Sequence, residues 1–230
     1  MSQASTPAAT AEGRGSTARI VGVTAIAYAA SMIVQNVLFA FPPAPNYGDP
    51  LDVVLTYHAQ NQSVLAVTSG LEAVNMLLLL LFVTALHGLV QRRGGIGADW
   101  SRLAVAAGAT LAVLSALTIA THIAVVLTAD GLAEPTPAFK LIWQLHAATF
   151  ALSLPALGAT FIGAALATHA SGLTRPWQRL IGVAGGSLPI LAGLGNRAIA
   201  GGSPVLFVGV LGLAMWLVWL IVTGLRLIRA

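Results

Sequence analysis

SVLAVTSGLEAVNMLLLLLFVTALHGLVQRR, residues 63–93, is the stretch that decides the fold. About 20 consecutive apolar residues are enough for an α-helix to cross the hydrocarbon core of a bilayer. The stretch therefore predicts a membrane span, yet it carries Glu72 well inside. A carboxyl group is costly in hydrocarbon, so it faces the protein interior or water, and Glu72 is a candidate functional residue.

Other polar side chains share a helical face with Glu72. Thr68, Ser69 and Asn75 lie three or four residues away from it. Residues at this spacing are neighbours on one face of a helix. The stretch therefore predicts a small polar cluster around the carboxyl group, inside an otherwise apolar span.

The composition places the whole chain in a membrane. Of its 230 residues, 57% are hydrophobic and only 8% are charged, and the mean hydropathy is +0.86. Soluble domains have about 25% charged residues. The net charge of +4 is compatible with nucleic-acid binding, but the arginines lie in short segments between apolar runs, so we exclude nucleic acid as a partner. The absence of cysteine excludes disulfides and thiolate metal sites.

The apolar runs predict an all-α, polytopic membrane protein with six transmembrane helices. After a disordered cytoplasmic tail at 1–18, a single domain covers 19–230. Its spans are predicted at 19–41, 63–91, 102–128, 139–168, 178–199 and 204–226. Residues 51–60 are predicted to form a short helix at the membrane interface. Arg14 and Arg19 before the first run resemble the start of a signal peptide, but the run is long for one, so we favour an uncleaved span.

The basic residues predict the orientation. With both termini in the cytoplasm, nine basic residues lie on the inner side and two on the outer side. Such an excess in short loops is typical of the cytoplasmic face, and we expect a multi-pass protein of the cell membrane. The inner residues are Arg14, Arg19, Arg92, Arg93, Arg102, Arg175, Arg179, Arg226 and Arg229, and the outer ones are Lys140 and Arg197.

Polar residues gather in the outer half of these spans. At about 1.5 Å per residue, Glu72, His122 and His146 lie at similar depth. We predict these three as catalytic residues. The predicted ligand-binding residues are Gln35, Asn75, Gln144 and Arg197. The inner half is nearly all apolar, which predicts a polar pocket that opens outward.

Three kinds of chemistry fit this set of residues. Glu72 acts as an acid or base, with a histidine as the complementary group. Alternatively, Glu72, His122 and His146 bind a metal such as zinc. In the third interpretation, His122 and His146 are the axial ligands of a b-type haem. The cofactor is therefore left open.

Plainer interpretations apply to several of the same residues. Glu72 and the histidines could simply form hydrogen bonds between packed helices. His58 is expected to be a solvated loop residue, and Arg197 to extend to the interface. Trp216 and Trp219 are expected to pack in the core, and the glycines of span 178–199 to allow close helix packing.

Sequence motifs leave the function open. The chain has no G-x-S-G, no N-P-A and no H-E-x-x-H motif. Our leading hypothesis is an outward-facing intramembrane pocket for a hydrophobic or amphiphilic small molecule, such as a lipid or terpenoid. The alternatives are a small-molecule or proton-coupled transporter, and a haem- or metal-binding protein or accessory subunit of a membrane complex. Whether the protein is an enzyme stays open.

Overall fold

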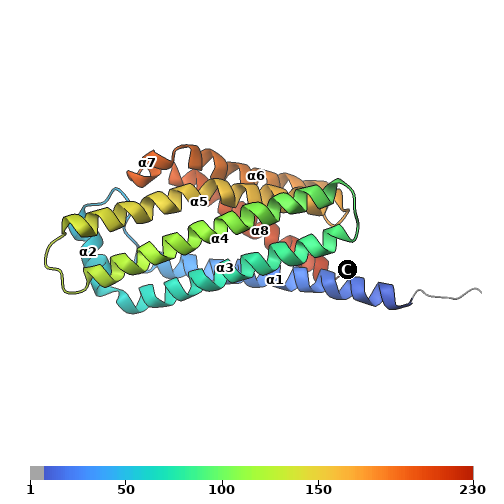
Figure 1. The fold of residues 1–230 in the computed structure, drawn as a ribbon, viewed down its shortest axis with the longest axis horizontal. Helices are drawn as coiled ribbons and strands as arrows, with labels where there is room; N and C mark the ends of the chain where they lie inside the picture. Colours follow the sequence, from blue (N-terminus) through green and yellow to red (C-terminus); the bar gives the residue numbers. More distant parts are fainter. Residues whose placement is uncertain (1–7, 230) are drawn as a thin grey trace, which may run out of the picture.

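The computed structural model describes residues 8–229, and this part of the chain is all-α, without a β-strand. Six long helices lie side by side, with two short helices near one end (Figure 1). The long helices are α1 (Ala8–Ala40), α3 (Gln62–Gln91), α4 (Ile96–Ala129), α5 (Pro137–Ala170), α6 (Pro176–Leu194) and α8 (Leu206–Ile228). The short ones are α2 (Leu51–Gln60) and α7 (Asn196–Ala200).

The long helices form a closed ring in chain order. Each of α1, α3, α4, α5, α6 and α8 packs against the next, and α8 packs against α1. Helix α1 begins and α8 ends at the same end of the bundle, and α2 lies at the opposite end (Figure 1). The first and last long helices are therefore neighbours, and every long helix has two partners along the ring.

Five helices in residues 8–229 are long and apolar enough to cross a membrane. They are Thr17–Ala40 of α1, α3, α4, α5 and α8. Helix α6 is not among them, because its 19 residues begin with Pro-Trp-Gln-Arg and include four glycines. The prediction of a multi-pass all-α membrane protein is thus confirmed at the level of several apolar helices.

The helix boundaries follow the predicted ones closely, apart from an earlier start of α4 at Ile96 and two further differences. Helix α1 already begins at Ala8, so 8–18 of the predicted tail is helical, while residues 1–7 lie outside the described part. The span predicted at 178–199 is interrupted, because α6 ends at Leu194 and α7 starts at Asn196 after Gly195. The predicted interfacial helix at 51–60 is α2, with Pro50 just before it.

An aromatic layer fills the half of the bundle that contains the start of α1 and the end of α8. Trp216 stacks between Phe161, at a ring-centroid distance of 4.0 Å, and Trp219, at 4.3 Å. Phe82 meets both indoles edge-on. All four side chains are buried, as expected for Trp216 and Trp219. Rings from α3, α5 and α8 thus close the centre of the ring of helices.

Glycine allows α5 and α6 to approach backbone to backbone. A side chain at Gly158 would collide with the carbonyl oxygen of Gly186, and one at Gly186 would lie 2.6 Å from the carbonyl oxygen of Gly158. Small residues at such crossings are common in membrane helices. The predicted role of the glycines in close packing is confirmed at this crossing.

Candidate functional site

A chain of hydrogen bonds links α1 to Glu72. The side-chain amide of Asn75 donates to Gln35 Oε1, and Gln35 Nε2 donates to Glu72 Oε1 over 3.4 Å. Both amides are oriented by the carboxylate, which can only accept once it is ionised. The sequence correctly places Asn75 on the face of Glu72, and α1 adds Gln35 from the neighbouring helix.

The second carboxylate oxygen faces a histidine. Glu72 Oε2 lies 3.8 Å from His122 Nδ1, and the two side chains are only 16% and 5% exposed. This distance allows an ion pair when the imidazole is protonated, but it is too long for a hydrogen bond. Three buried atoms of this group have no hydrogen-bond partner in the described structure: Glu72 Oε2, Asn75 Oδ1 and His122 Nδ1.

Behind Glu72 the imidazoles form an aromatic cluster. His122 stacks on His146, with centroids 5.1 Å apart and an interplanar angle of 27°. His58 meets His122 edge-on at 5.7 Å. Trp143 stacks on His146 and contacts His58. Three histidines from α2, α4 and α5 thus lie together on one side of the carboxyl group.

Backbone and loop contacts set the protonation pattern of His146. Its Nδ1 lies 3.1 Å from the Thr118 carbonyl oxygen, which can only accept, so this nitrogen carries the proton. Its Nε2 lies 3.4 Å from the Tyr47 hydroxyl and therefore accepts from it. Burial raises the pKa of Tyr47, and the negative charge of Glu72 raises it further, so this hydroxyl keeps its proton. Both nitrogens of His146 are thus occupied, which makes it a positioned neutral ring.

His58 is not among the predicted site residues, and the prediction that it is a solvated loop residue is wrong. His58 is 2% exposed, because α2 folds over the end of the bundle and turns it inward. Its Nδ1 lies 2.7 Å from the Val54 carbonyl oxygen of the preceding turn. A signal was present in the sequence: Val54 and His58 lie four residues apart, on one face of the short helix.

The burial of His58 predicts an acid-sensitive fold. Burial lowers the pKa of His58 to about 4, and the nearby His122 also lowers it, against the backbone hydrogen bond to Val54. Between this value and the ordinary 6.5, the unfolded chain binds more protons than the folded one. The free energy of unfolding therefore decreases as the pH is lowered through this range. From pH 7 to pH 5, we expect this histidine alone to reduce the free energy of unfolding by about 2 kcal/mol.

Thermal unfolding in detergent across this pH range checks the expectation. His58→Asn keeps a side-chain amide near the Val54 carbonyl but does not titrate, so its stability should fall less steeply on acidification. An equally steep fall in the variant would assign the acid sensitivity to other groups.

A cavity of about 180 Å³ begins at Glu72 and is lined by residues of α1, α3, α4, α5 and α8. Its polar end carries Gln35, Glu72 and Asn75, and the rest is mainly apolar. Val210 both lines the cavity and is 47% exposed, so the cavity opens beside it. The other lining residues are Tyr28, Met32, Met76, Leu79, Leu111, Ser115, Thr118, Ile119, Phe150, Ser153, Leu154, Leu157, Leu206, Gly209 and Leu213. The aromatic layer lies one helical turn beneath this cavity. Its rings Phe82, Phe161 and Trp216 follow the lining residues Leu79, Leu157 and Leu213 by three or four residues.

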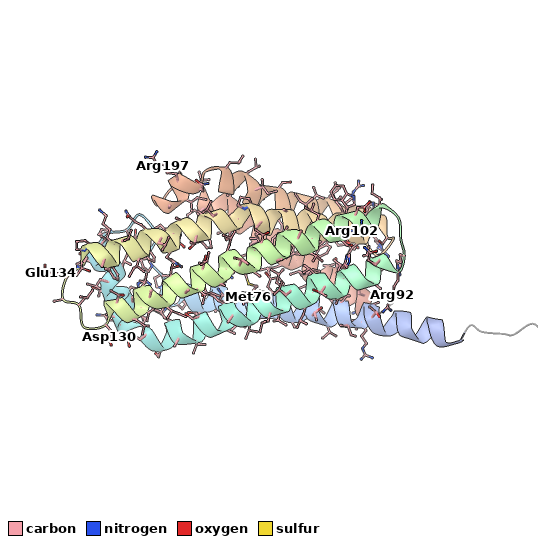
Figure 2. The ribbon with its side chains drawn as sticks, in the orientation of Figure 1. Met76, Arg92, Arg102, Asp130, Glu134 and Arg197 are labelled. Atoms are coloured by element: carbon pink, nitrogen blue, oxygen red, sulfur yellow. The ribbon has the colours of Figure 1, made fainter. Side chains whose placement is uncertain are left out.

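The structure brings together five of the seven predicted site residues. Glu72, His122, His146, Gln35 and Asn75 form the group described above. Gln144 and Arg197 do not join it, because both side chains are exposed. Arg197 lies on the short helix α7 and points away from the bundle (Figure 2). Neither residue lines the cavity beside Glu72, where they were predicted to bind a ligand.

The geometry does not favour the haem or metal interpretations. Two axial imidazoles present their nitrogens to one iron from opposite faces of a porphyrin, whereas His122 and His146 stack on each other. Within residues 8–229, no group of three or more His, Cys, Asp or Glu side chains is arranged to hold a metal ion.

Together, the apolar helices and the buried polar group define a multi-pass helical membrane protein with a carboxyl group at the head of an apolar cavity. Comparison of the chain with protein-family models, with curated proteins and with solved structures gives no match.

Proposed function

We propose that the protein binds a hydrophobic or amphiphilic small molecule, such as a lipid or terpenoid, in the cavity enclosed by α1, α3, α4, α5 and α8. The observation that carries this proposal is an apolar cavity with a single polar end, where Glu72 Oε2 and Asn75 Oδ1 are buried without partners. Buried polar atoms normally have a hydrogen-bond partner. A ligand with a polar head and an apolar body would satisfy both halves of this site.

The proposal includes six spans, cytoplasmic termini and a cavity in the outer half of a cell-membrane protein. Helix α6 fills the ring between α5 and α8, and its 19 residues would extend about 28 Å, close to the thickness of the hydrocarbon core. Arg92 and Arg102 lie at the end where α1 begins, and Asp130 and Glu134 lie at the other (Figure 2). This separation of charge supports the orientation inferred from the basic residues.

The same site has the groups for proton transfer. Glu72 can exchange a proton with a ligand in the cavity, and His122 lies on its other side at 3.8 Å. The occupied nitrogens of His146 leave it to hold the His122 ring by stacking. Binding needs only the carboxyl group and its amide neighbours. Acid–base chemistry on the ligand would in addition require His122.

Filling the cavity is expected to remove the ligand. Ser115 lines the cavity, and Ser115→Leu would replace its hydroxyl group with three carbon atoms. Native mass spectrometry of protein purified gently from its own membrane should show a bound small molecule in the wild type. We expect at least tenfold lower occupancy in Ser115→Leu and in Glu72→Gln.

The matched control is Thr110→Leu, an exposed position on the same helix. It should leave occupancy unchanged. If Ser115→Leu, Glu72→Gln and His146→Ala all kept the wild-type occupancy, the molecule would be bound elsewhere and the proposed site would be wrong.

A further inference from the structure

We propose that the ligand of this cavity carries a protonated amine, with Glu72 as its counter-ion. This inference rests on the proposed function and specifies the chemical class of the head group. Two observations support it: the polar atoms at this end of the cavity that have no hydrogen-bond partner, and the absence of basic residues among the described residues that line the cavity.

The unsatisfied atoms of the cavity head are acceptors. One amide proton of Asn75 and one of Gln35 are directed along the chain that ends at Glu72 Oε1. This leaves Glu72 Oε2 and Asn75 Oδ1 buried without a donor. A head group that fits them must therefore donate hydrogen bonds. An ammonium group offers up to three donors, whereas a carboxylate or phosphate would add further acceptors.

The charge around the cavity also favours a cation. Among the described residues that line it, Glu72 is the only acid, and there is no lysine, arginine or histidine. An anionic head group would meet the carboxylate of Glu72 with no positive charge in the lining to offset it. A buried charge is tolerated when it is paired, and a cation entering with the ligand would complete this pair.

His122 does not form a hydrogen-bonded ion pair with Glu72. Its Nδ1 lies 3.8 Å from Glu72 Oε2 without a hydrogen bond, and it is not among the residues that line the cavity. Glu72 thus lines the space that the ligand enters, whereas His122 does not. The ammonium group would approach from the cavity, and the imidazole would remain behind the carboxyl group.

The cavity also limits the body of the ligand. A cavity of about 150 Å³ accepts benzene, so about 180 Å³ admits a short alkyl chain or one ring. The opening beside Val210 lets a longer chain extend outward between α1 and α8. A primary amine on an apolar chain fits this shape.

The test compares three ligands with the same chain: octylamine, octan-1-ol and octanoate. Protein in nanodiscs of phosphatidylcholine is titrated with each by isothermal calorimetry at pH 7.5, with empty nanodiscs as the reference. For the wild type, we expect octylamine to bind at least tenfold more tightly than octan-1-ol, and octanoate to bind more weakly than both. Glu72→Gln should remove the preference for the amine, and Glu72→Asp, which keeps the charge, should retain most of it.

The outcomes separate this inference from the proposed function. Equal binding of amine and alcohol, both lost in Ser115→Leu, would keep the cavity as a ligand site and overturn the amine. A preference for the amine that persists in Glu72→Gln would also overturn it. Binding of none of the three ligands to a wild type that unfolds cooperatively would refute both proposals.

Discussion

Gly158→Val is expected to destabilise the bundle by more than about 3 kcal/mol and to abolish most of the folded protein. The first side-chain atom at this position would collide with the carbonyl oxygen of Gly186, and the next nearest contact is Ile190. The obstacle is backbone, so no change of rotamer on α6 can relieve it. Helices α5 and α6 would have to separate along the crossing. Thermal unfolding in detergent and the yield of monodisperse protein measure the effect.

Gly70→Val is the matched control. Gly70 is also helical, in α3, but nothing lies within 4 Å of a side chain built there. Because valine has a higher helix propensity than glycine, this variant should be as stable as the wild type, or more stable by less than about 1 kcal/mol. Equal loss of stability in the two variants would contradict the assignment of the loss in Gly158→Val to the close crossing of α5 and α6.

Trp216→Ala is the second large change, with an expected cost of about 3–5 kcal/mol. Trp216 is fully buried and stacks between Phe161 and Trp219. Its removal would leave a void in the middle of the aromatic layer, which side chains from three different helices cannot easily close. The melting temperature in detergent should fall strongly, and the cavity above should gain volume toward the centre of the bundle.

Trp177→Ala serves as the comparison, because Trp177 is 44% exposed at the start of α6. It removes the same side chain without opening the core, so the melting temperature should change little. A larger effect for Trp177 than for Trp216 would contradict the placement of the aromatic layer at the centre of the fold.

Sequence periodicity predicted the elements and the depth of the site. The apolar run around Glu72 is α3, and Asn75, one turn further along it, shares the polar cluster with Glu72. Counting residues from the helix ends also placed His122 and His146 at the same depth. This count was sufficient because α4 and α5 have the same length and pack side by side. These features depend on local spacing and length, which the sequence states directly.

The direction of each side chain around its helix was harder to predict. Gln144 has the depth of His146 but lies two residues away, a rotation of about 200°, and it points outward. The inward turn of His58 depends on how α2 folds over the bundle, and the contact of Tyr47 with His146 depends on the loop before it. Such contacts depend on the tertiary path of a connection, which local spacing does not specify.

The aromatic layer beneath the cavity affects how fast a ligand exchanges. Because the rings of Phe161, Trp216 and Trp219 fill the bundle beneath the cavity, we expect a bound molecule to enter and leave through the opening beside Val210. Association and dissociation then cross the same barrier, so its height changes both rates by one factor and leaves the equilibrium constant unchanged. Residence time is therefore set largely by the packing of α1 and α8 at the opening, whereas the fraction of protein occupied is set by the polar end at Glu72.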